Sequence, residues 1–145
     1  MSINIKRAVL AGVVGTIVMT MIGTLVAPMM GMPKMNPADM LASQMGGNAM
    51  LGWAGHFMIG IGFAMAYGFL TTSLPGPLAV RGALFGMGPW LMAQVAVMPM
   101  MGMGLFSGSM MLAGGSLLGH IMYGAVVALV YGAPSPASRG RVVAA

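Results

Sequence analysis

Acidic residues are almost absent from this sequence: its 145 residues include a single one, Asp39, and no cysteine. Without a second carboxylate, one chain cannot supply the paired acids of general acid–base catalysis. Without cysteine, the chain forms no disulfide, iron–sulfur cluster or thiolate metal site. Charged residues make up only 5% and hydrophobic residues 59%, whereas roughly a quarter of a soluble domain is charged. We therefore expect a lipid bilayer as the surrounding solvent.

Four uncharged, apolar stretches are long enough to cross a bilayer core, which takes about 20 helical residues. The sequence therefore predicts an all-α fold, a four-helix transmembrane bundle over residues 1–132. A Pro-, Ser- and Ala-rich cytoplasmic tail, residues 133–145, is expected to be disordered. The predicted spans are residues 8–27, 51–70, 82–98 and 110–131.

The loop between the first two spans carries the signals of a short helix. Asn36 is a suitable N-cap and Pro37 a suitable first helical residue, and Asp39 falls in the first turn, where the helix dipole favours an anion. We predict a surface helix over residues 37–45, with Met40 and Leu41 inserted into the membrane interface.

The basic residues are distributed unevenly between the predicted loops. Cytoplasmic loops of membrane proteins retain Lys and Arg, so this distribution predicts cytoplasmic N- and C-termini. The basic residues do not form the clustered patch that phosphate binding requires, and we expect no nucleic-acid partner. The residues expected in the cytoplasm are Lys6, Arg7, Arg81, Arg139 and Arg141, and only Lys34 is expected outside.

The chain contains an internal similarity. GHFMIGIGFAMAYG (residues 55–68) and GHIMYGAVVALVYG (119–132) share seven identical positions, and PMMGM occurs at residues 28–32 and again at 99–103. This pattern predicts two tandem helical hairpins in the same orientation. Such a parallel repeat has a pseudo-two-fold axis along the membrane normal.

Small residues recur every four positions in both copies, and each series begins at a histidine. Residues four apart share a helix face, and small residues on one face let membrane helices approach closely. We therefore predict that His56 and His120 point into the bundle or into a subunit interface. The predicted packing residues are Gly60, Ala64, Gly68, Gly124, Ala128 and Gly132.

Histidine and methionine are the candidate ligands. His56 and His120 are the only histidines; each could hydrogen-bond a neighbouring helix, or the pair could bind a metal ion or the axial positions of a haem. Of 21 methionines, 14 lie in residues 28–58 and 98–111. Methionine fills gaps in apolar cores, but its thioether also suits Cu(I). The candidate metal ligands are His56, His120, Met29, Met30, Met100 and Met101.

An enzymatic role is not expected. Ser116 and His120 share a helix face, but the position matching Ser116 in the first copy is Gly52, and no third group is available to orient a dyad. We predict no catalytic residues.

The segment AGVVGTIVMTM (residues 11–21), together with the two GH-x-M-x-G segments and their Tyr-Gly ends, resembles a family of small four-span bacterial membrane proteins of unknown function. The resemblance covers about residues 6–132. It implies a bacterial inner-membrane location and an intact four-helix unit, and it implies no activity.

Three functional hypotheses follow. The first is a non-enzymatic accessory or scaffold subunit that packs through its Gly/Ala faces on other membrane-protein subunits or on itself. The second is an extracytoplasmic Cu(I)-binding or copper-handling protein that uses His and Met. The third is a haem b protein with His56 and His120 as axial ligands. The cofactor is thus unknown, with Cu(I) and haem b as the two candidates.

Overall fold

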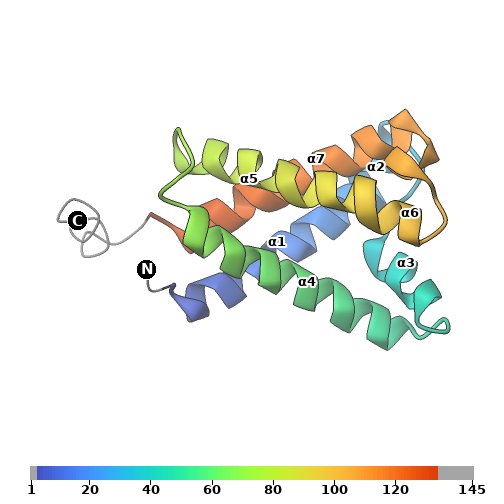
Figure 1. Ribbon diagram of the computed structural model, residues 1–145, viewed down its shortest axis with the longest axis horizontal. Coiled ribbons are helices and arrows are strands. Elements are labelled where there is room, and N and C mark those ends of the chain that lie inside the picture. The colour runs from blue at the N-terminus through green and yellow to red at the C-terminus, as the bar shows by residue number, and fades with distance from the viewer. Residues whose placement is uncertain (1–2, 134–145) are drawn as a thin grey trace.

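The computed structural model describes residues 3–133, which form helices and no β-strand. The elements run along the bundle in an up-and-down order (Figure 1). Their bounds are α1 (Ile5–Met21), η1 (Ile22–Val26), α2 (Ala27–Met29), α3 (Pro37–Gln44), α4 (Ala49–Leu70), α5 (Leu78–Met92), η2 (Ala93–Val97), α6 (Met98–Met100), η3 (Leu105–Gly108) and α7 (Met110–Tyr131).

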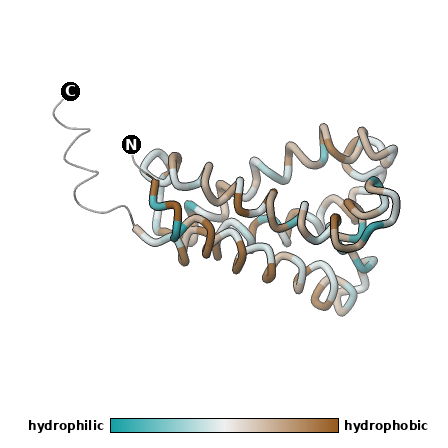
Figure 2. The backbone as a smooth tube through the Cα atoms, turned by 90° about the horizontal axis from the view of Figure 1, so that it is seen from below, coloured by the Kyte–Doolittle hydropathy of each residue, from teal (hydrophilic) through white to brown (hydrophobic). Residues whose placement is uncertain are grey.

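Within the described residues, four helical segments are long and apolar enough to cross a membrane. These segments confirm the four predicted apolar helices and extend them at several ends. Hydrophobic residues run along all four, and hydrophilic residues lie mostly toward the two ends of the bundle (Figure 2). The arrangement fits a membrane protein. The segments are Ile5–Met29, Ala49–Leu70, Leu78–Met100 and Met110–Tyr131.

Two of these segments contain a π-helical turn, η1 or η2, just before a proline. Pro28 follows η1 and Pro99 follows η2. Proline has no N–H to donate, and its ring collides with the carbonyl four residues earlier. A wider turn moves that carbonyl away, so both helices continue for one more short turn.

The packed core lies at the end of the bundle where α1 begins and α7 ends (Figure 1). The backbone N–H of Asn4 donates to the Tyr131 hydroxyl at 3.2 Å, which joins the start of α1 to the end of α7. Tyr67 packs edge-on against both Phe85 and Tyr131, with ring centroids 5.3 and 5.9 Å apart. Together with buried alanines of α1, α4 and α7, these rings close this end of the bundle.

Glycines set the closest helix contacts. A β-carbon at Gly12 of α1 would lie 2.5 Å from the Cα of Ile61 in α4, and a β-carbon at Gly82 of α5 would overlap the Gly124 carbonyl of α7. Only a residue without a side chain lets backbones meet at this distance. The pairs α1–α4 and α5–α7 therefore pack tightly, and α1 also packs on α7.

The predicted packing residues lie at these contacts, with one exception. Gly60 faces Thr16, Gly68 faces Tyr131, and Gly124 faces Gly82, while Ala64 and Ala128 are fully buried. Gly132 is different because it follows α7 with a φ of 80°, where it caps the helix end. The faces predicted for helix packing are thus used within the chain.

Helices α4 and α5 meet near their connecting loop and diverge toward the opposite end (Figure 1), where they scarcely touch. Near that end, α3 packs on α4, where its Ala38 and Ala42 cover Gly52. The preceding loop is fixed to η1 by a hydrogen bond from Met35 N–H to the Gly23 carbonyl at 3.0 Å.

The basic residues divide between the two ends. Arg7 and Arg81 lie at the closed end, where they donate to the carbonyls of Tyr131 and Thr71, and Lys34 lies in the loop before α3 at the other end. Arg139, Arg141 and the predicted tail beyond Ala133 lie outside the described residues.

Candidate functional site

The divergence of α4 and α5 leaves a cavity of about 970 Å³ in the half of the bundle opposite the packed core. Residues of α1, α3, α4, α5, η2 and α7 line it. It extends from Lys34 and Asp39 at the outer rim to Thr16 and Tyr123 at the inner end. The Tyr123 hydroxyl donates to the Gly60 carbonyl and so joins α7 to α4 there.

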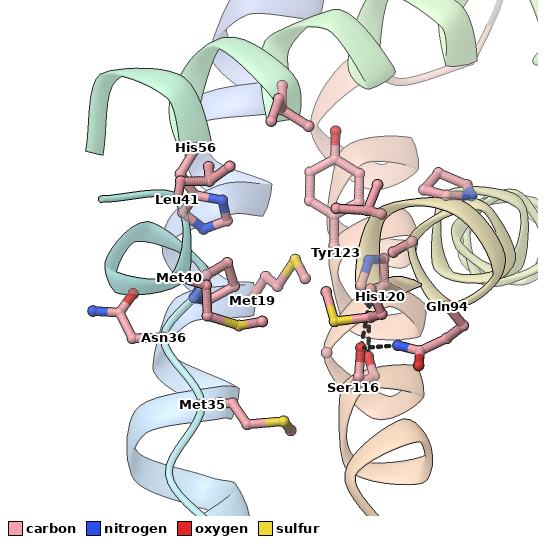
Figure 3. Close-up of a pocket in the computed structure, with 18 of the residues that line it drawn as sticks. Met19, Met35, Asn36, Met40, Leu41, His56, Gln94, Ser116, His120 and Tyr123 are labelled. Carbon is pink, nitrogen blue, oxygen red and sulfur yellow. Dashed lines mark hydrogen bonds between the residues drawn. The ribbon is translucent and has the colours of Figure 1, made fainter. Parts of the chain in front are cut away.

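Both histidines line this cavity. Figure 3 shows His56 and His120 on opposite walls, with the Met19 side chain between them. At 1.5 Å per residue, His56 lies about 10 Å and His120 about 15 Å along the axis from the starts of α4 and α7. The two rings therefore lie inside the bundle rather than at its end.

The hydrogen bonds of His56 define its tautomer. Its Nε2 lies 3.1 Å from the Thr20 Oγ1 of α1, and that hydroxyl donates its one proton to the Thr16 carbonyl at 2.9 Å. Thr20 must therefore accept from His56, so Nε2 carries the hydrogen. The other ring nitrogen, Nδ1, is left with its lone pair and has no hydrogen-bond partner among residues 3–133.

The hydrogen bonds of His120 define the other tautomer. Its Nδ1 lies 2.8 Å from the Ser116 carbonyl oxygen, and since a carbonyl only accepts, Nδ1 carries the hydrogen. The lone pair is then on Nε2, which has no hydrogen-bond partner in the described part of the chain. The Ser116 hydroxyl is 3.4 Å from the same Nδ1, and a protonated nitrogen cannot accept the serine proton, so the pair is not arranged as a nucleophile and its base.

A second polar group, Gln94, supports the His120 wall. Gln94 is 1% exposed and lies in η2, where its amide nitrogen donates to Ser116 Oγ at 3.3 Å and its amide oxygen accepts from Ser107 Oγ at 2.8 Å. Both ends of the amide are thus satisfied by hydroxyl groups from other segments. The amide holds the Ser116 side chain beside His120.

Unlike Gln94, Thr16 has a buried polar group without a hydrogen-bond partner among residues 3–133. Its side chain is 1% exposed and lines the inner end of the cavity, and its hydroxyl has no hydrogen-bond partner within the described residues. Leaving a buried hydroxyl unpaired costs about 1–3 kcal/mol. The hydroxyl lies against Gly60 in the contact between α1 and α4, and it is too deeply buried to be reached from the cavity.

The predicted methionine ligands are only partly brought together. Met29, Met30 and Met100 are 87%, 62% and 85% exposed and are not among the cavity residues, whereas Met101 lines the cavity with both histidines. No group of three or more His and acidic side chains that could hold a metal occurs in residues 3–133. The methionines that line the cavity are Met19, Met35, Met40, Met92, Met98, Met101 and Met103.

The outer loop forms a short helix that belongs to the cavity wall. The predicted surface helix is α3, and the Asn36 side chain accepts from Ala38 N–H at its start. However, α3 packs on α4, and its Met40 and Leu41 line the cavity. The glycines at positions 52 and 55 of α4 leave room for α3 to approach, a tertiary effect that the loop's own sequence does not reveal.

Sequence reasoning also missed Thr16, Met19 and Ser107 as site residues. Thr16 and Met19 are part of an apolar span whose pattern resembles a packing helix, and Ser107 lies in a turn with a φ of 58°. The spacing of Thr16 and Thr20 relative to His56 could not be used, because the pairing of α1 with α4 was not known from the sequence.

Comparison with known protein families gives a match over residues 3–141, to a family described as being of unknown function. No curated protein and no solved structure matches the chain. The geometry of the cavity is therefore the evidence from which a function is inferred.

Proposed function

The chain belongs to the family of unknown function DUF6789, and we propose that it is a non-enzymatic integral membrane protein. In this proposal it binds a lipophilic small molecule in the cavity, in the open half of its bundle. The observation that carries this proposal is a cavity of about 970 Å³ lined by both histidines, each of which has one ring nitrogen without a hydrogen-bond partner among residues 3–133. Ligand sites in proteins are concave, mostly apolar and about 300–1,000 Å³ in volume, with a few placed polar groups.

The position of the cavity supports a ligand that arrives from the lipid phase. Its rim includes Ile59 of α4 and Met92 of α5, which are 47% and 48% exposed on the outer surface of two diverging helices. An apolar molecule reaches such a rim from the hydrocarbon region without crossing water. The packed rings of Tyr67, Phe85 and Tyr131 close the other half of the bundle, so the shape supports binding rather than passage.

An accessory or scaffold role was the leading hypothesis from the sequence. It relied on the Gly/Ala faces as contacts with other subunits, and those faces are occupied by contacts within the chain, such as Gly60 with Thr16 and Gly124 with Gly82. A scaffold also has no use for a large cavity with unpaired polar groups. The ligand-binding role therefore accounts for more of the structure, and contacts with other subunits remain compatible with it.

Copper binding is the second candidate, and one observation favours it. Met19 lies between His56 and His120 (Figure 3), and a thioether with two imidazole lone pairs is a soft ligand set that suits Cu(I). A haem b held by both histidines is less well supported, because His56 would have to break its Thr20 hydrogen bond to present Nε2.

The internal similarity supports a duplicated hairpin. Gly31 and Gly102, which occupy equivalent positions in the two copies, have φ values of 79° and 78°, and both follow a π-helical turn and a proline. We propose a parallel repeat in which the first copy acquired α3. Since α3 has no counterpart in the second copy, the two halves pack differently and leave the cavity open on one side.

We propose a bacterial inner-membrane location with the closed end of the bundle in the cytoplasm, because Arg7 and Arg81 lie there and Lys34 lies at the other end. Alkaline phosphatase inserted between Gly46 and Gly47 should be active, and the enzyme inserted after Gly76 should be inactive. The reverse pattern of activities would contradict this orientation.

A matched pair of variants tests the ligand-binding role. Gly62 of α4 lines the cavity and Gly88 of α5 does not, and a β-carbon at either position meets nothing within 4 Å. Gly62→Trp should therefore obstruct the cavity, whereas Gly88→Trp adds the same side chain facing lipid. Both proteins should fold.

The readout is the set of lipophilic molecules that co-purify with the protein in mild detergent, measured by solvent extraction and mass spectrometry. Wild type and Gly88→Trp should retain one molecule in near-stoichiometric amount, and Gly62→Trp should lose it. Equal content in all three proteins, or no bound molecule in any, refutes the ligand-binding role.

A further inference from the structure

The hydrogen-bond pattern of the cavity also specifies the chemistry of its ligand. Building on the ligand-binding role, we propose that the bound molecule is a lipophile with hydroxyl groups, of the hydroquinone type, whose O–H groups donate to His56 and His120. The juxtaposition that carries this inference is two imidazole lone pairs on opposite walls of a single apolar cavity.

The two histidines select for a hydrogen-bond donor. The hydrogen on His56 Nε2 is given to Thr20, and the hydrogen on His120 Nδ1 is given to the Ser116 carbonyl. Only His56 Nδ1 and His120 Nε2 remain, and both are acceptors. A ligand that offers only acceptors, such as a ketone or an ether, leaves both nitrogens unsatisfied, and unsatisfied buried groups strongly disfavour the wrong ligand.

The apolar cavity limits the kind of donor that fits. An alkylammonium group donates, but the burial of its charge is costly in an apolar environment, and a carbonyl accepts but cannot donate. A hydroxyl group donates to each histidine without the burial of a charge.

The positions of the two histidines add the requirement for two donors. His56 and His120 lie on opposite walls with Met19 between them (Figure 3), so a ligand of some length must present one donor toward each wall. An aromatic ring with hydroxyl groups on opposite sides has this form. Its hydrocarbon tail would extend past Ile59 and Met92 toward the lipid.

The test uses two probes with the same ring and tail, 2-decylhydroquinone and its 1,4-dimethyl ether, in which methyl groups replace both hydroxyl hydrogens. Binding to the full chain in detergent micelles is titrated without oxygen by the fluorescence of Trp53 and Trp90. One hydrogen bond corresponds to about a tenfold change in affinity at most, so the hydroquinone should bind about 30- to 100-fold more tightly than the ether.

Three variants separate the roles of the polar groups. His56→Phe and His120→Phe should each reduce the preference for the hydroquinone about tenfold, while affinity for the ether, which also reports that the variant is folded, stays within about twofold. Thr16→Val is the control, because it removes a buried hydroxyl that a ligand in the cavity does not reach, and it should leave the affinity for both probes within about twofold.

The outcomes distinguish this inference from the ligand-binding role. If both probes bind equally and Gly62→Trp blocks both, the cavity binds lipophiles and the hydroxyl requirement is wrong. If neither probe binds and Gly62→Trp changes nothing, the ligand-binding role fails as well. Stoichiometric Cu(I) binding that both histidine variants abolish, without a preference for the hydroquinone, would assign the lone pairs to a metal and overturn the inference.

Discussion

Substitution of Gly12 by alanine tests whether backbone contact between α1 and α4 sets the width of the closed half. The added β-carbon would lie 2.5 Å from the Cα of Ile61 and 2.9 Å from its nitrogen, whereas ordinary contacts begin at 3.4 Å. The two helices must therefore separate by about 0.9 Å at this point. No side-chain movement relieves the overlap, because both partners are backbone atoms.

The expected cost follows from opposing effects. Overpacking of a tight contact costs about 1–3 kcal/mol, and the displacement of α4 also stretches the hydrogen bond between Tyr123 and Gly60, which is worth about 0.6 kcal/mol in a membrane. Alanine regains up to about 1 kcal/mol through helix propensity. We expect Gly12→Ala to lower the free energy of unfolding by about 1–2 kcal/mol.

Unfolding in mixed micelles by increasing SDS, followed by the fluorescence of Trp53 and Trp90, measures this change. Gly114→Ala is the matched control, because a β-carbon at that position meets nothing within 4 Å, and it should be neutral or slightly stabilising. Gly115→Ala is the second control: its β-carbon would meet the Met32 sulfur at 2.9 Å, a flexible side chain that can move. If Gly12→Ala is as stable as either control, the reasoning from backbone contact is refuted.

Three further substitutions test single interactions by the same unfolding assay. Tyr123→Phe removes the hydrogen bond to the Gly60 carbonyl and should lower the free energy of unfolding by about 0.6–1.5 kcal/mol; an unchanged value would mean that the bond contributes nothing. Asn48→Ala removes the acceptor for Leu51 N–H at the start of α4 and should cost about 1 kcal/mol, whereas Asn48→Ser should restore most of it. Thr16→Val removes the unpaired hydroxyl and should stabilise the ligand-free protein by about 1 kcal/mol; a loss of stability would show that the hydroxyl already has a partner.

The long helices could be predicted from the sequence because each is coded locally. A run of about 20 apolar residues without charge has one stable state in a bilayer, and all four such runs are helices in the structure. The short helix α3 is equally local, since Asn36 and Pro37 specify its start. The small residues that share a helix face with His56 and His120 predicted an inward direction for both, and both histidines line the cavity.

The site itself could be predicted only in part. Of the predicted ligands, His56, His120 and Met101 line the cavity, whereas Met29, Met30 and Met100 are exposed and do not line it; whether any of them binds a ligand stays a prediction. Consecutive methionines in PMMGM cannot all face the same way on a helix. Which of them faces the cavity depends on the π-helical turns η1 and η2, because a wider turn rotates the residues that follow it around the helix axis. The pattern of apolar residues does not show where such a turn occurs.

By itself, then, the sequence determined the number of long helices and their apolar, membrane-length character, because these depend on the composition and spacing of residues along one segment. Only the tertiary structure decided that α4 and α5 diverge, that α3 fills a place beside Gly52, and that Thr16 is left unpaired at the end of a cavity. Those features depend on how backbones from distant segments approach one another, to within fractions of an ångström at glycine contacts. No periodicity along a single helix encodes that distance.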